Sequence, residues 1–502
     1  MQDRPFLSMD ISNPTWWAYV ALLIVAVYFR FSRVFSVRNF DLILLILLST
    51  SLTATVSWKD RSWPRQVSAN PLQTRLPADR ALGTRTIPVS LSTRQLGAVA
   101  SSNEEAIGGV EPANVLPVDE KNSREPGSGG LSALQHPVSR WGSLGLLVVT
   151  AVLLMRLIMD ENLSRRPRLD QNLNFAGLTF LCIPAFGILM AHVALLSPHL
   201  NTQKAMLYGK ALLERQDVRV DPDADSTEHP APTETLVAAG GSIVGELADK
   251  EPDWIARGLV ISAHTLVVLG LMAIGRWHFA SVQLGVAMIC LYLLLPCTGV
   301  YVHRLSHVLP AACLIWAFAS YRKPVVAGVL LGLASGTLFF AVFLLPLWTV
   351  FYGRRGGLRF LISVMAVAAI LITSLMFISR DASSFTSKLI TTANWTVYRL
   401  LQDPVVTGDA NVSHLTIRII MAALFFVMLT AMTVLPRPRN LENLLANSTC
   451  LIVAAQMWYP DDICHYVIWY LPLLLLIIFR PRLDHLIPPQ AEESVAPAVS
   501  VA

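Results

Sequence analysis

Long apolar segments, many of them ended by arginine, recur along this chain almost to its C-terminus. Leu259 to Ile274, Leu358 to Ile378 and Ile417 to Leu435 are three of them. A helix needs roughly 20 mostly apolar residues to cross the hydrocarbon core of a bilayer. The pattern therefore predicts an all-α fold, a polytopic transmembrane helix bundle of about 12–13 spans. The expected spans are 16–29, 40–56, 141–158, 174–196, 258–274, 280–302, 307–320, 325–352, 360–378, 416–435, 444–459 and 463–479.

The distribution of basic residues predicts which membrane face each loop occupies. Cytoplasmic loops carry an excess of lysine and arginine, counted over short connections. The poorer loops are 303–306, with one arginine, and 460–462, which contains two aspartates. We therefore expect the inner cell membrane, with the N-terminus outside and the C-terminus in the cytoplasm. The basic side comprises Arg30, Arg33, Arg38, Arg156, Arg165, Arg166, Arg168, Arg276, Arg322, Lys323, Arg354, Arg355, Arg359, Arg437, Arg439, Arg480 and Arg482.

One segment, Val325 to Tyr352, is too long for a comfortable single crossing and has basic residues at both ends. A single span would place Arg354 and Arg355 on the wrong side of the membrane. Two short helices folded as a hairpin, with the turn near residues 335–337, restore the pattern. One long tilted helix is the alternative.

Two polar stretches divide the apolar segments. Residues 57–140 are rich in Pro, Ser, Gly and charge, and they cannot bury enough apolar area to offset their ordering entropy. Residues 197–257 are mixed, with helical spacing from Thr202 to Arg219. The expected organisation is a helix pair at 1–56, an exterior loop at 57–140, a helix pair at 141–196, an exterior loop with a short surface helix at 197–257, a C-terminal bundle at 258–483 and a flexible cytoplasmic tail at 484–502.

Composition agrees with a lipid-embedded chain. Charged residues make up only 15% of the chain and mean hydropathy is +0.52, so the bilayer is the expected partner. The net charge of +5 does not indicate nucleic acid, because the basic residues lie at span ends instead of on one patch. Six cysteines lie mostly inside apolar runs without a C-x-x-C pair, which is typical of small buried side chains.

The densest polar turn near the membrane is residues 298–307, TGVYVHRLSH. Arg304 can hold a phosphate by paired hydrogen bonds. His303 and His307 are four residues apart, so on a helix they would share a face, and histidine can act as an acid or base near neutral pH. An ordinary interfacial loop with aromatic residues at the headgroup level is the other interpretation.

A second cluster, residues 458–466 (WYPDDICHY), lies on the same predicted face. Asp461 and Asp462 can bind a divalent cation or accept a proton, although adjacent carboxylates in a short loop are commonly just solvated. His465 begins the last span, where an ionisable group is a functional hypothesis by default. Span centres are otherwise almost free of ionisable residues, with His192 among the few exceptions, which disfavours a transporter.

Glycines at 328, 332 and 336 form a tandem G-x-x-x-G pattern, which indicates close helix packing. Around them, residues 321–334 (YRKPVVAGVLLGLA) resemble the R-x-P-x-x-A-G-x-x-x-G-L-A stretch of GT-C superfamily membrane glycosyltransferases, the polyprenyl-phosphate-mannose users in particular. Residues 343–348 (FLLPLW), 353–356 (GRRG) and 465–472 (HYVIWYLP) extend the resemblance over roughly 257–483.

The resemblance implies a GT-C-like bundle that moves a sugar from a polyprenyl-phosphate-linked donor at the outer face. It implies Asp60 as the base for the acceptor hydroxyl, and Arg304 with His303 and His307 as phosphate ligands. Asp461, Asp462 and His465 would hold a metal or the acceptor. The lysine and proline that follow G-L-A in the family are absent here. A non-catalytic, degenerate membrane scaffold therefore stays as the alternative function, with a transporter third.

Overall fold

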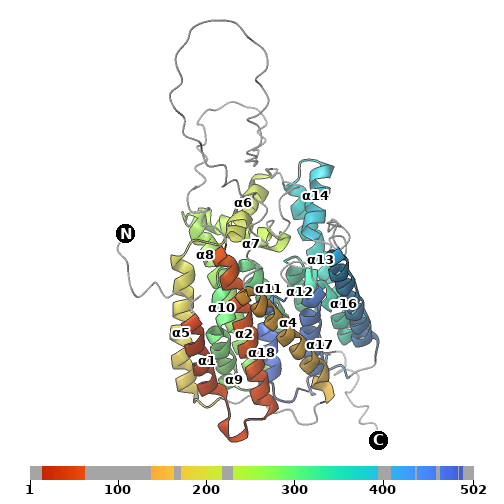
Figure 1. The fold of residues 1–502 in the computed structure, drawn as a ribbon. Coiled ribbons are helices and arrows are strands. Elements are labelled where there is room, and N and C mark those ends of the chain that lie inside the picture. Colours follow the sequence, from red (N-terminus) through yellow and green to blue (C-terminus); the bar gives the residue numbers. More distant parts are fainter. Residues whose placement is uncertain are drawn as a thin grey trace, which may run out of the picture.

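The computed structural model describes residues 14–62, 137–162, 171–216, 230–337, 339–393, 409–435, 438–458, 464–483 and 485–489. Every regular element in these ranges is helical, which confirms the all-α prediction. Among the described helices, five are long and apolar enough to cross a membrane, and shorter apolar helices pack beside them. The chain is a membrane protein built as a helix bundle (Figure 1).

The helices follow one another with these bounds: α1 Pro14–Tyr28, α2 Val37–Ser62, α4 Pro137–Ile158, α5 Phe175–Leu195, α6 Leu200–Glu214, α7 Pro232–Leu247, α8 Pro252–Trp277, α9 Val282–Leu294, α10 Pro296–Val300, α11 Leu305–Ala319, α12 Pro324–Ser335, α13 Leu345–Phe377, α14 Ala382–Ala393, α16 Asp409–Val434, α17 Leu441–Trp458 and α18 Val467–Phe479. Short 3-10 turns lie at η1 Phe31–Arg33, η3 Met159–Asn162 and η5 Phe339–Leu344.

The bundle has two distinct ends. Helices α6, α7 and α14 gather at the upper end in Figure 1, here named the α6–α7 end. The opposite end carries the start of α2, the ends of α4 and α18, and the start of α17, and is here named the Arg480 end. Helix α4 packs on α2 and α17, whereas α5 packs on α9 and α8. Two helices that adjoin in sequence, α4 and α5, thus belong to different parts of the bundle.

The segment 325–352 contains the predicted break. Helix α12 ends at Ser335, and the chain returns through η5 and the first part of α13. The Tyr352 hydroxyl donates to the Tyr321 carbonyl at 2.6 Å, which places both ends of the segment at the Arg480 end. This confirms two short helices and excludes one long tilted helix.

Helix α13 is itself two helices joined at a sharp reversal. Gly353 has φ +70°, a conformation that glycine adopts without the steric cost other residues meet. The Trp348 and Phe360 rings stack across the reversal, with centroids 6.2 Å apart and an interplanar angle of 15°. The chain therefore runs toward the α6–α7 end in α12, returns to the Arg480 end at Tyr352, and runs toward the α6–α7 end again after Gly353.

The glycine ladder packs α12 against the second half of α13, as predicted from its spacing. A β-carbon on Gly332 would lie 3.0 Å from Val367 Cβ, and one on Gly328 would lie 2.6 Å from the Phe360 carbonyl oxygen. Gly336 faces Leu371. Because the contact residues rise together along both helices, α12 and this half of α13 run parallel.

The stretch 197–257 contains more ordered structure than a loop with one helix. The helix expected from Thr202 corresponds to α6, and a second helix, α7, begins at Pro232. The two pack at Gly209, where a β-carbon would lie 2.6 Å from the Ala239 nitrogen. Thr233 anchors α7 to the bundle, since its hydroxyl donates to the Leu333 carbonyl at 2.8 Å.

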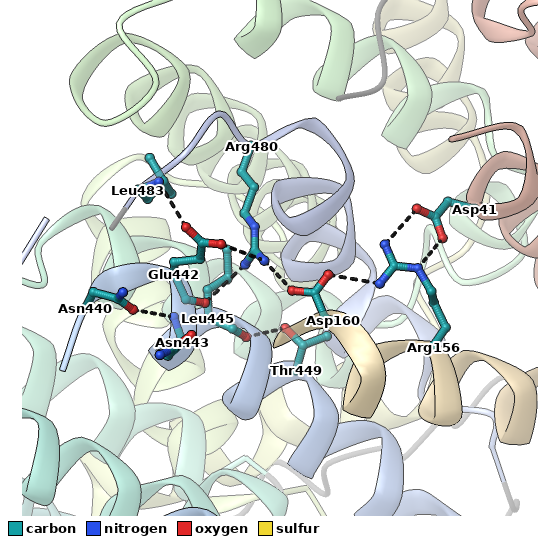
Figure 2. Close-up of polar contacts among 10 residues, drawn as sticks. All are labelled: Asp41, Arg156, Asp160, Asn440, Glu442, Asn443, Leu445, Thr449, Arg480 and Leu483. Atoms are coloured by element: carbon teal, nitrogen blue, oxygen red, sulfur yellow. Dashed lines mark hydrogen bonds and ion pairs between the residues drawn. The ribbon is translucent and has the colours of Figure 1, made fainter. Parts of the chain in front are cut away.

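A buried ionic network closes the Arg480 end (Figure 2). Arg156 holds Asp41 with two hydrogen bonds, 2.9 Å from Nε to Oδ1 and 3.0 Å from Nη2 to Oδ2, and holds Asp160 at 2.9 Å. Arg480 pairs with Asp160 and, at 3.3 Å, with Glu442. The five side chains are at most 14% exposed. Charges are tolerated at this depth because each is paired and hydrogen-bonded.

The network changes the interpretation of two arginines. Arg156 and Arg480 belong to the basic set that the sequence predicts for cytoplasmic loops, but both side chains point into the bundle. Arg38, one turn from Asp41, is the nearest cation in sequence. It donates to the Tyr28 carbonyl at 3.0 Å, while Asp41 takes its two hydrogen bonds from Arg156, 115 residues away.

Candidate functional site at the α6–α7 end

The polar turn 298–307 forms the centre of the candidate site. Pro296 starts the short helix α10, and the backbone at Arg304 is extended (φ −94°, ψ 98°) before α11 begins at Leu305. His303 and Arg304 therefore lie in a break between two helices. His307 lies in the first turn of α11, so the expectation that His303 and His307 share a helix face is wrong.

His303 instead pairs with His192 in the last turn of α5. The two ring nitrogens, His303 Nε2 and His192 Nδ1, are 2.8 Å apart, so one ring donates a proton that the other accepts. Burial, with the nearby His192 as a second cause, lowers the pKa of His303 to about 4. His303 is therefore a neutral imidazole near pH 7, and it contributes hydrogen-bonding groups without charge.

His264 on α8 also contacts the turn 298–307. The sequence alone did not identify it as a site residue. Its Nε2 lies 3.1 Å from the Val302 carbonyl, which can only accept, so Nε2 carries the proton. Its Nδ1 then accepts from the Tyr292 hydroxyl at 3.1 Å. The ring is fully buried and both nitrogens are paired. A histidine inside an apolar span was the available signal.

Arg304 is the cation of the site. Its guanidinium lies over the Tyr301 ring, 5.1 Å from the centroid, and the side chain is half-buried. Within the described ranges no carboxylate lies at ion-pairing distance from it. A half-buried guanidinium with no described carboxylate partner is suited to binding an oxyanion, because it offers a planar set of donors.

His199, the N-cap of α6, adds a residue of the α6–α7 helices to the site. Its Nδ1 accepts from the Asn201 backbone nitrogen at 3.3 Å. Burial, and to a smaller extent Arg304 and His303, lower its pKa to about 4. Helix α6 also packs against α11, which begins directly after Arg304. The sequence alone did not identify His199.

The two polar clusters of the sequence meet through stacked rings. His307 lies between Tyr301 and Tyr466, with centroids 4.5 and 5.2 Å away and interplanar angles of 12° and 15°. His465 is therefore next to a residue that touches the 298–307 turn, and it is half-buried before α18 begins. The predicted phosphate ligands thus share one region, although His303 and His307 face different partners.

Glu234 on α7 is a buried acid at the same end of the bundle. It occupies the third position of α7 after Pro232, and it accepts a hydrogen bond from the Ala231 backbone nitrogen, the N-cap position. Burial raises its pKa to about 8 despite that hydrogen bond, so it is mostly protonated at pH 7. The proline followed two residues later by glutamate was the sequence signal for this helix start.

The structure does not describe the side chains of the other three predicted site residues. Asp60 falls in the last turn of α2, with its side chain outside the described part, and Asp461 and Asp462 lie outside the described residues. The described side chains include no group of three or more His, Cys, Asp or Glu arranged for a metal ion. All six cysteines are buried, as predicted, and none forms a disulfide.

No family model, curated protein or solved structure matches this chain. The chemistry of the site is therefore inferred from its own residues. The site has the half-buried guanidinium of Arg304, the neutral imidazoles of His199 and His303, and two tyrosines stacked on His307. Together these groups suit an oxyanion attached to an apolar or sugar-bearing molecule.

Proposed function

We propose that this membrane protein is a GT-C-like glycosyltransferase that transfers a sugar from a polyprenyl phosphate donor at the outer membrane face. The observation that carries the proposal is Arg304, half-buried and without a described carboxylate, beside the neutral His303 and His199. The resemblance of residues 321–334 and 465–472 to that superfamily supports the same class. The α6–α7 end is then exterior, and the Arg480 end is cytoplasmic.

In the proposed reaction, a base takes the proton of the acceptor hydroxyl as that oxygen attacks the anomeric carbon. The bond between this carbon and the donor phosphate breaks, and negative charge grows on the departing phosphate. Arg304 stabilises that charge with paired hydrogen bonds. Such hydrogen bonds stabilise a developing charge more strongly where water is excluded than in bulk water. Asp60 is the proposed base, and a divalent cation at Asp461 and Asp462 would assist the phosphate.

The test is transfer of radiolabelled mannose from polyprenyl-phosphate-mannose in membranes that contain the chain. Arg304→Gln should lower the transfer rate by about 10²-fold, the cost of removing one charge-stabilising donor. Arg304→Lys should recover only part of it, because a lysine lacks the planar pair of donors. Arg276→Gln, an exposed arginine at the Arg480 end, is the matched control and should leave the rate unchanged. Wild-type transfer by Arg304→Gln would refute the proposed site.

A non-catalytic membrane scaffold is the second candidate, favoured by the absence of the lysine and proline that follow G-L-A in the superfamily that residues 321–334 resemble. A scaffold of this kind would still bind the lipid phosphate. Retention of polyprenyl-phosphate-mannose by the purified wild-type chain, with no transfer to any membrane acceptor and weaker retention by Arg304→Gln, would support the scaffold and exclude the enzyme.

A further inference from the structure

Two turns at the Arg480 end lie against the reversal at Gly353, so three connections meet at one place. The Tyr352 hydroxyl binds the Tyr321 carbonyl at 2.6 Å, so the α11–α12 turn lies against the reversal. A β-carbon on Gly353 would lie 3.4 Å from Arg439 Nη1, so the turn before α17 reaches the same point. Segments distant in sequence thus present their flanking residues together.

Those flanking residues are cations. Lys323, Arg354, Arg355 and Arg439 have exposed side chains, and we name these four the basic patch. Arg322 extends it, with its guanidinium 5.9 Å from the Tyr321 ring centroid. The patch therefore gathers positive charge at one place instead of spreading it around the rim.

The described carboxylates of this end do not neutralise the patch. Asp41, Asp160 and Glu442 are all buried and directed to Arg156 and Arg480 (Figure 2). Within the described part of the chain, Lys323, Arg354, Arg355 and Arg439 therefore have no carboxylate at ion-pairing distance. An anion from outside the chain is the complementary partner.

The surroundings of the patch indicate what that anion is attached to. Leu358 and Ile362, one and two turns beyond Arg354, are 61% and 60% exposed, and Val325 beside Lys323 is 50% exposed. In a membrane-spanning bundle such side chains face acyl chains. The cations therefore lie where hydrocarbon gives way to headgroups, and basic clusters at this level bind lipid phosphates.

We propose that the basic patch is a binding site for the phosphate of an anionic phospholipid in the leaflet at the Arg480 end. The three guanidinium groups, from two turns, hold the phosphate oxygens, and Lys323 adds a fourth charge from a third turn. The acyl chains lie along the exposed faces of α12 and α13. The site is independent of the site at the α6–α7 end.

The test is native mass spectrometry of the full chain released from nanodiscs of phosphatidylcholine and phosphatidylglycerol in equal amounts. Wild type should retain phosphatidylglycerol preferentially, and the triple variant Arg354→Gln/Arg355→Gln/Arg439→Gln should lose about fivefold or more of that preference. The matched control, Arg30→Gln/Arg33→Gln/Arg276→Gln, removes the same charge from other exposed arginines of this end and should change it less than about twofold.

Equal losses in the two variants would refute a localised site, as would an absence of preference in wild type. A soluble phosphate ligand is distinguished by adding inorganic phosphate. Displacement of phosphatidylglycerol by millimolar phosphate would overturn the lipid assignment. If the triple variant does not fold, the salt dependence of the wild type is the test. Its preference for phosphatidylglycerol should fall in about 1 M salt, where the Debye length is about 3 Å. A preference that does not change with salt would contradict the proposal.

Discussion

His192 Nδ1 and His303 Nε2 lie 2.8 Å apart and join the last turn of α5 to the break before α11. This contact links a helix from the first half of the chain to the polar turn of the candidate site. It also holds the two imidazoles in a half-buried environment, where a positive charge on both rings at once would be unfavourable. The pH dependence of stability should therefore report on this end of the bundle.

We expect acid to destabilise the protein through His199 and His303. Their folded pKa values of about 4 lie below the ordinary 6.5, so between pH 4 and 6.5 the unfolded chain binds protons that the folded chain does not. The contribution of these two histidines to stability should rise with pH across this window, by up to about 1.4 kcal/mol per pH unit for each group, and be constant above it. Thermal unfolding midpoints in detergent from pH 4 to 7 measure this. The variant His303→Gln should flatten the curve; an unchanged slope would contradict the assignment.

Glu234 should act in the opposite direction. Its folded pKa of about 8 exceeds the ordinary 4.5, so between these values the folded chain holds a proton that the unfolded chain has lost. Its contribution to stability should fall as pH rises from 4.5 to 8. Glu234→Gln keeps the shape without the ionisation, and its unfolding midpoint should exceed that of wild type most at pH 8. Glu246→Gln on the same helix is the control. A larger gain at pH 5 than at pH 8 would be inconsistent with a buried neutral acid.

Breaking the ionic network should be costly. Arg156→Met leaves Asp41 and Asp160 without their shared partner, and removing one member of a buried pair costs about 3–5 kcal/mol. Lys210→Met removes the exposed pair with Glu214 and should cost less than about 1 kcal/mol. Unfolding free energies in denaturing detergent compare the two. Similar values for both variants would show that the network does not stabilise this end.

Close packing at Gly328 should not tolerate a methyl group. A β-carbon there would contact Ser363 Oγ and lie 2.6 Å from the Phe360 carbonyl oxygen, which is backbone and cannot move away cheaply. Gly328→Ala should therefore destabilise the bundle by about 1–3 kcal/mol. Gly240→Ala on α7 meets nothing within 4 Å and should be neutral or stabilising, because glycine is a poor helix residue. The same unfolding assay decides, and a Gly328→Ala variant as stable as Gly240→Ala would argue against the α12–α13 contact.

The chain's own sequence determined the helices, because the length of an apolar run and its glycine and arginine ends are local properties. The break after Ser335 and the packing role of Gly328, Gly332 and Gly336 were predictable on that basis. Only the tertiary structure decided which polar groups meet. His192 and His303 are 111 residues apart, and Arg156 and Asp41 are 115 apart, so nothing local pairs them. The order in which apolar helices pack sets those contacts, and many packings would satisfy the same hydrophobic pattern. For that reason Arg156 and Arg480 looked like loop arginines in sequence and are buried ion-pair partners in the fold.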